Sequence, residues 1–220
     1  ECLRLAREVG AHVEAPFAIA RIAETAYCVG DFDAAEKLLA EADAESDRHG
    51  GVYDVSSFAR LLSSLLAIQR GDTARAWSEY RLARAAAAQH QVPAQFIAGM
   101  DTVEAVLTAH DHGPEVGLTL IGPAFATAVG AYCAERFLAG MAEAAAVMLA
   151  DAGRPAEAVR TFAAATAWRT GHPRSVPEEA AVAGLPARIL TVLGADAYGR
   201  EEAAGAALLP SAVVTALTGS

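Results

Sequence analysis

The chain has 220 residues, of which 54% are hydrophobic and 6% aromatic, with a formal net charge of -10 at pH 7. This acidic balance argues against direct contact with nucleic acid, because affinity for phosphate backbones comes from clustered Lys and Arg. Cys2, Cys28 and Cys133 are widely spaced, which favours neither a disulfide framework nor a zinc site. The most apolar stretch falls short of the roughly 20 residues of a membrane span. We therefore expect a reduced, cytoplasmic setting and no membrane contact.

Helices are expected along the whole chain, beginning with the end of one helix over residues 1–9 that Gly10 stops. Four helix pairs follow it. We expect the first helix of each pair at residues 16–29, 53–70, 94–110 and 132–152. Residues Asp33 to Glu36 have the form of a capping box that opens one second helix. Pro114 and Pro155 suit the first position of two other second helices.

The four pairs recur at a constant interval of about 41 residues, a length found among helical repeats. The turn of each pair is expected at Gly30, Gly71, His112 and Gly153. Seven positions before each turn stands a small residue: Ala23, Ser64, Ala105 and Ala146. Three positions after each turn also recur: a small residue at position five, a large one at nine and Ala at twelve. In the first pair these residues are Ala35, Leu39 and Ala42. Such a pattern is typical of stacked repeats, which bury their apolar faces against their neighbours.

After Gly171 the interval is expected to stop. Residues 172–177 are predicted to form a linker, in which Ser175 and Glu178 are spaced as another capping box. Helices are then expected at residues 178–193, 197–207 and 211–217. Because terminal units of a repeat array are atypical, this tail is predicted to cap the array.

The repeat pattern resembles that of tetratricopeptide repeats, as Ala23, Gly30, Ala35, Leu39 and Ala42 illustrate. The interval is longer than is usual in that family, and HEAT-like repeats come nearer in length but lack this spacing of small residues. The family's terminal Pro is replaced by Asp47, Ala88, Val129 and Thr170. In the third repeat His112 and Gly117 replace the expected Gly and Ala.

This resemblance implies an all-α fold, a right-handed α-α superhelix of tetratricopeptide-like helical hairpins with a C-terminal helical cap. Residues 1–10 would end a preceding repeat, residues 11–171 would form four hairpins, and residues 172–220 would form the linker and the capping helices.

The tail carries a narrower resemblance. Leu193 to Tyr198, Gly205 and Leu208 to Val214 look like the end of the helical-repeat region in large actinobacterial transcription regulators. Those are multidomain ATP-binding proteins of the LuxR type and of the antibiotic-regulatory type. The resemblance implies a nucleotide-binding domain before the repeats and a DNA-binding domain at one end of the parent protein. It covers about the last third of this chain.

Sequence motifs of common enzyme classes are absent from the chain, which has no G-x-x-x-x-G-K-[ST], G-x-S-x-G or H-E-x-x-H sequence. His110-Asp111-His112 has metal-ligand chemistry but lacks two further ligands, so a solvated turn is favoured over a metal site. Asp43, Glu45 and Asp47 alternate like the start of a calcium loop. They lack the required Gly and terminal Glu and are interpreted as a solvated helix face. No enzyme activity, metal or cofactor is predicted.

Stacked repeats bind partners on their concave surface, which in tetratricopeptide folds is formed by the first helix of each repeat. Carrying the family's inward positions across predicts a mostly apolar groove. Its residues are Phe17, Glu24, Tyr27, Phe58, Leu61, Leu65, Gln69, Thr102, Val106, His110, Glu143 and Val147. Such a groove suits an amphipathic helix or an extended peptide. The alternative, that Phe58, Leu61 and Leu65 are core residues of their own hairpin, remains open.

The sequence thus predicts a noncatalytic protein-interaction or effector-sensing module of a bacterial transcription regulator. Its partner would be another domain of the parent protein, another protein or peptide, or a small-molecule effector, and an exposed apolar groove leaves a homodimer open. The alternatives are a general peptide-binding or co-chaperone-type scaffold, whose grooves usually carry several Lys or Arg, and, least favoured, an enzyme that uses the repeat cavity.

Overall fold

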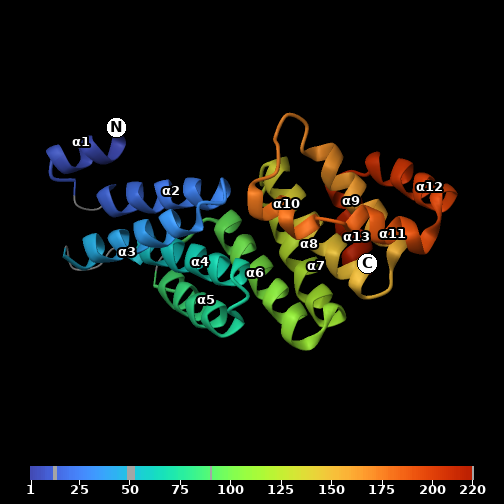
Figure 1. The fold of residues 1–220 in the computed structure, drawn as a ribbon, viewed down its shortest axis with the longest axis horizontal. Helices are drawn as coiled ribbons and strands as arrows, with labels where there is room; N and C mark the ends of the chain where they lie inside the picture. The colour runs from blue at the N-terminus through green and yellow to red at the C-terminus, as the bar shows by residue number, and fades with distance from the viewer. Residues whose placement is uncertain (12–13, 49–52, 90, 220) are drawn as a thin grey trace. The chain divides into compact units, whose positions relative to one another are not determined.

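The computed structural model describes residues 1–11, 14–48, 53–89 and 91–219, and every regular element among them is an α-helix (Figure 1). The helices are α1 (Cys2–Glu8), α2 (Glu14–Cys28), α3 (Phe32–Arg48), α4 (Tyr53–Gln69), α5 (Thr73–Ala87), α6 (Ala94–His112), α7 (Pro114–Gly130), α8 (Glu135–Asp151), α9 (Pro155–Trp168), α10 (Val176–Val182), α11 (Leu185–Leu193), α12 (Ala195–Ala206) and α13 (Pro210–Thr218). None of these helices has the length and apolar character needed to cross a membrane. The predicted all-α class is confirmed.

The chain divides into two compact units, one of residues 1–92 with 175–177 and one of residues 93–174 with 178–220. In the first unit α2 packs against α3 and α4 against α5, and α4 also contacts both helices of the preceding pair. In the second unit α6 packs against α7 and α8 against α9, and α8 contacts both α6 and α7. The predicted first helices correspond to α2, α4, α6 and α8, so the interval correctly indicates which helices pair.

Small residues at fixed repeat positions let the two helices of a pair approach closely. The positions seven before and five after each predicted turn are buried in all four pairs. In the second pair, Ser64 Oγ donates a 2.8 Å hydrogen bond to the Ala76 carbonyl across the helix crossing. In the third pair, a Cβ on Gly117 would lie 2.5 Å from Ala109 Cβ and 2.9 Å from the Ala105 carbonyl oxygen. Gly117 replaces the Ala that the pattern expects because the two helices of this pair approach too closely for a side chain at this position.

The turns of three pairs lie at the predicted glycines, and the third turn does not. Gly30, Gly71 and Gly153 have φ values of 83°, 72° and 73°. In the third pair α6 continues through His112, and Gly113 takes the positive φ of 96°. Placing that turn at His112 was wrong, because a residue with a Cβ is strained at positive φ and the adjacent glycine is not.

Helix starts follow local capping chemistry. Pro114 and Pro155 occupy the first positions of α7 and α9, as predicted. The capping box at Asp33 is wrong, because α3 begins at Phe32 and the Asp31 carboxylate accepts a 3.1 Å hydrogen bond from the Ala34 backbone. Asp31 thus satisfies a backbone donor that the first turn leaves free.

The tail differs from its prediction in two ways. A single helix over residues 178–193 is wrong, since α10 ends at Val182 and α11 begins at Leu185, with Gly184 at φ 74° between them. The repeat also continues, because Gly194 follows Gly153 at the same interval, has φ 77° and joins α11 to α12. In this fifth pair the corresponding small residues, Ala187 and Gly199, are exposed. The turn is therefore repeated without the tight helix crossing.

The tail helices complete the core of the second unit. α11 and α12 pack against α9, and α13 packs against α7. Val213 of α13 is fully buried in an apolar cluster with Phe125 and Trp168. The Trp168 indole donates a 3.0 Å hydrogen bond to the Leu208 carbonyl. Residues after 184 are thus an integral part of this unit.

Candidate functional site

The predicted groove residues fall into two groups, because α2 and α4 belong to the first unit and α6 and α8 to the second. Phe17 of α2 and Phe58 of α4 stand at the same repeat position. Their ring centroids lie 6.2 Å apart, and Phe17 is 47% exposed. The Arg21 guanidinium carbon lies 5.4 Å from the Phe58 ring centroid, and the same side chain pairs with Glu24 at 2.6 Å. We call Phe17, Phe58, Arg21 and Glu24 the aromatic patch.

The remaining predicted residues of the first unit are mostly used in packing. Tyr27 and Leu61 are buried, and the Tyr27 ring lies 5.7 Å from that of Phe32. Leu65 packs against the apolar cluster between α2, α3 and α4. Gln69 at the end of α4 is partly exposed. Apart from Leu65 and Gln69, the exposed or partly exposed predicted groove residues of this unit therefore lie in the aromatic patch.

In the second unit, the residues predicted on α6 have local partners. The Thr102 hydroxyl donates a 2.7 Å hydrogen bond to the Ala98 carbonyl of its own helix. Val106 packs against the apolar cluster of the second unit. His110 is exposed, with Nδ1 3.0 Å from an Asp111 carboxylate oxygen. Within the described ranges, no group of three or more His, Cys, Asp or Glu side chains is placed to hold a metal ion.

The acidic residues of α3 are less exposed than predicted. Glu45 is buried and pairs with Arg48 at 2.7 Å. Asp43 pairs with Arg60 of α4 at 3.0 Å. Burial raises the pKa of the Asp43 carboxyl, although Arg60 opposes the shift and the charges of Glu79 and Asp47 add to it. The interpretation of these carboxylates as a solvated helix face holds for exposed Asp47 but is wrong for Asp43 and Glu45, because the neighbouring helix α4 packs against α3.

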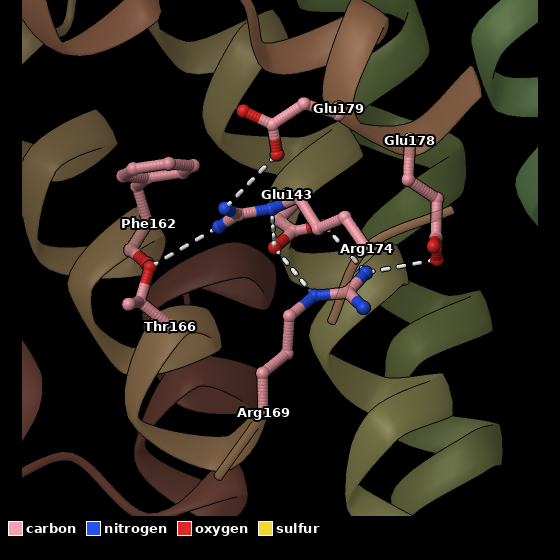
Figure 2. A network of polar contacts seen from close by, with 7 residues as sticks. All are labelled: Glu143, Phe162, Thr166, Arg169, Arg174, Glu178 and Glu179. Atoms are coloured by element: carbon pink, nitrogen blue, oxygen red, sulfur yellow. Dashed lines mark hydrogen bonds and ion pairs between the residues drawn. The ribbon is translucent and has the colours of Figure 1, made fainter. Parts of the chain in front are cut away.

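Glu143 of α8 lies at the centre of a buried ion cluster (Figure 2). Its side chain is only 4% exposed. Arg169, which follows α9, donates from Nε and Nη2 to the two carboxylate oxygens at 2.7 Å each. Arg174 donates from Nε to Oε1 at 2.8 Å. Glu143 is thus satisfied by two guanidinium groups of its own chain, which is the geometry in which a buried carboxylate is tolerated.

Two acidic residues of α10 complete this ion cluster. Arg169 Nη2 donates to Glu178 at 2.8 Å, and Arg174 lies 3.5 Å from Glu179 (Figure 2). Burial acts to lower the pKa of Arg169, but its hydrogen bonds to Glu143 and Glu178 outweigh it and leave that pKa raised. Arg169 therefore stays charged, and the cluster ties the segment after α9 and helix α10 to α8.

Arg174 also packs on α9. Its guanidinium carbon lies 5.2 Å from the centroid of the Phe162 ring, and Nη2 donates to Thr166 at 3.3 Å. Stacking of a planar guanidinium on an aromatic face holds the side chain in one orientation. The sequence predicted Glu143 as a groove residue, whereas the structure buries it, and nothing in the sequence indicated its two arginines. They follow it by 26 and 31 residues, and no spacing rule connects those positions.

A pocket of about 250 Å³ lies between α8 and the turn from α10 to α11. It is lined by Val147, Ala181, Ala183, Gly184, Leu185 and Arg188. Val147 was predicted to be a groove residue, and Arg188 pairs with Asp151 of α8 at 2.8 Å. The first helix of the fourth pair is therefore covered by residues of the tail.

No family model, no curated protein and no solved structure matches the chain. The function is therefore inferred from the geometry described above and from the resemblances in the sequence.

Proposed function

We propose that this chain is a noncatalytic, partner-binding helical-repeat module of a cytoplasmic bacterial transcription regulator. The paired helices at a constant interval support a tetratricopeptide-like array, and the tail resemblance supports the regulator. In this proposal the hairpins belong to a right-handed α-α superhelix. The partner is another domain of the parent protein, most directly its nucleotide-binding domain.

The aromatic patch is the observation that carries this proposal. Two phenylalanines at equivalent positions of consecutive first helices contact each other, and one of them remains 47% exposed. An aromatic side chain with a neighbouring arginine is the composition in which binding energy concentrates at protein interfaces. The Arg21–Glu24 pair is partly exposed, so exchanging it for a partner's carboxylate changes the free energy little. The patch therefore suits an apolar or aromatic anchor flanked by an acidic residue.

Binding at this patch would couple the partner to the repeat array. A domain or effector that contacts α2 and α4 more favourably in one arrangement of the hairpins shifts the population towards that arrangement. By linkage, an effector that changes the arrangement changes the affinity for the partner by the same factor. A sensing role needs no catalytic group.

The test uses the nucleotide-binding domain of the parent protein, supplied in trans, with affinity measured by calorimetry. We expect Phe17→Ala to weaken binding by about tenfold or more, as loss of an interface anchor does. Leu82→Ala is the matched control, because Leu82 is an equally exposed apolar residue on a second helix, α5. It should leave the affinity unchanged. Circular dichroism checks that both variants are folded.

Two outcomes would reject parts of this proposal. Equal weakening by Phe17→Ala and Leu82→Ala would show that the patch is not the site. No binding of the domain, and no protection of α2 and α4 from proteolysis, would remove the intramolecular partner. An external peptide or a small effector, as in a general repeat scaffold, would then be the remaining interpretation.

A further inference from the structure

Helix α10 is held mainly by side chains. It has seven residues, well below the roughly 12–15 that an isolated helix needs to be marginally stable in water. Among the described helices, none packs along α10 with the extended backbone contact seen within the hairpins. Residues 176 and 177 at its start belong to the first unit, where the Val176 side chain lies against Gly30. From Glu178 onwards, the position of α10 on α8 depends on the ion cluster around Glu143 and on a few apolar contacts such as that of buried Val182.

The ion cluster has a buried half and an exposed half. Glu143 and Arg169 are 4% and 8% exposed, so their separation would leave a charge without a partner in the interior. Glu178 and Glu179, which α10 contributes, are 38% and 66% exposed. Water can replace the arginines as their partners at much smaller cost. The outer half can therefore open while the Glu143–Arg169 pair stays closed.

Two glycines flank the segment that would move. Gly171 has φ 77° and Gly184 has φ 74°, and a Cβ at either would meet nothing within 4 Å. Both lie outside the helices they separate and are free of packing, which are the properties of hinge positions. We call residues 172–183, between these glycines, the strap. The pocket of about 250 Å³ at its C-terminal end shows that the strap does not fill the surface beneath it.

Gly140 of α8 explains why this face accepts a strap. A Cβ at Gly140 would lie 3.3 Å from a Glu178 carboxylate oxygen. The repeat interval gives Gly140 the same repeat position as Phe17 and Phe58 of the first unit. The first unit has a phenylalanine ring at this position. In α8 the glycine leaves room there for the Glu178 carboxylate. Beneath the strap, α8 then carries Glu143 with its bound Arg169 and, one helical turn later, Val147, which lines the pocket.

We propose that the strap is displaceable and covers, in cis, a second binding site on α8. The site takes a helical peptide with a carboxylate at the place of Glu178 and apolar residues three and four positions later, as Ala181 and Val182 are placed in the strap. The strap acts as a competitor built into the chain, because a tethered segment has a high effective concentration at its site. This site is separate from the aromatic patch and does not depend on the partner proposed for it.

Hydrogen exchange of the full chain, followed by mass spectrometry, tests the displacement. We expect amides of α10 to exchange at least about a hundredfold faster than those of α8 and α9, as in a locally opening segment. Glu178→Gln keeps the shape and removes the charge, and should speed exchange in α10 by about tenfold, the effect of weakening one charge-assisted hydrogen bond. Glu179→Gln is the matched control and should change nothing. Exchange in α8 and α9 should stay the same in both variants.

Peptide binding tests the covered site. The probe is a fluorescein-labelled synthetic peptide with the sequence of residues 176–190, and anisotropy gives its affinity. It should bind the Glu178→Gln chain about tenfold more tightly than the unaltered chain, because apparent affinity scales with the open fraction. The Glu179→Gln chain should bind it like the unaltered chain. A peptide in which Gln replaces the residue equivalent to Glu178 should bind more weakly to all three.

Three results would overturn the proposal. They are exchange of α10 as slow as that of α8 in the unaltered chain, failure of the peptide to bind any variant, and equal peptide affinity for the unaltered and Glu178→Gln chains. If Glu178→Gln were to unfold the unit, exchange in α8 and α9 would report it. The salt dependence of α10 exchange in the unaltered chain then decides, since screening of the exposed ion pairs must speed it and a purely apolar attachment would not respond in this way.

Discussion

The packing of α12 against α9 depends on Gly205. A Cβ at this position would lie 2.3 Å from the Arg160 carbonyl oxygen, 2.6 Å from Arg160 Cα and 2.8 Å from its carbonyl carbon. These are backbone atoms, which cannot rotate away as the end of a side chain can. Gly205→Ala therefore requires the two helices to separate by about 1 Å to restore ordinary contact.

The magnitude follows from two opposing effects. Overpacking a close contact destabilises by about 1–3 kcal/mol. Alanine has a higher helix propensity than glycine by up to about 1 kcal/mol, and less near a helix end such as that of α12. Separation of α12 from α9 also weakens the neighbouring apolar contacts of the tail. We expect a net loss of about 2 kcal/mol, which lowers the Tm by about 6 °C in a chain of this length.

Gly199→Ala in the same helix is the matched control. A Cβ there would meet nothing within 4 Å, so the substitution adds helix propensity without a clash. It should stabilise by about 0.5–1 kcal/mol. Urea unfolding followed by circular dichroism measures both variants. If Gly205→Ala stabilised the chain as Gly199→Ala does, the close approach of α12 to Arg160 would be refuted.

Two further predictions concern charged groups. Glu143→Gln removes the anionic partner of buried Arg169 and should destabilise by about 3–5 kcal/mol in urea unfolding; a loss below about 1 kcal/mol would mean that water reaches the ion cluster. The hydrogen bond from Arg154 lowers the pKa of the Glu157 carboxyl below its ordinary value of 4.5. Because the folded state then binds the proton less tightly than the unfolded state, this stabilisation is present above pH 4.5 and is lost as the pH falls through the lowered pKa. Urea midpoints of the unaltered chain and Glu157→Gln should therefore differ at pH 7 and converge in acid, and a difference that grows towards low pH would contradict this sign.

The helix pairs could be predicted from the sequence because their determinants are local and repeated. Helix propensity, turn glycines and small residues at fixed spacing all act over a few turns of chain. Ser64 illustrates this, since its small size and its distance from Ala76 follow from the interval alone. The same reasoning failed at His112, where a neighbouring glycine shifts the turn by one residue. It also missed that the interval continues at Gly194, because the large residue expected nine positions later is Ala203.

The candidate site was only partly predictable. The interval identified Phe17 and Phe58 as equivalent positions, but it could not tell that Tyr27 and Leu61 are buried while Phe17 stays exposed. That difference depends on how each helix is rotated about its axis against its neighbours. A shift of one residue along a helix turns a side chain by about 100°, enough to move it between the core and the surface.

The sequence by itself determined the all-helical class, the pairing of successive helices and the small residues at their crossings, because these depend on interactions between residues near each other in the chain. Only the tertiary structure decided what meets Glu143. Arg169 reaches it from the end of α9, which packs against α8, and Arg174 reaches it because the chain turns back after Gly171. The path of that segment is set by packing between distant residues, and a buried charge is stable only where such packing brings an opposite charge to it.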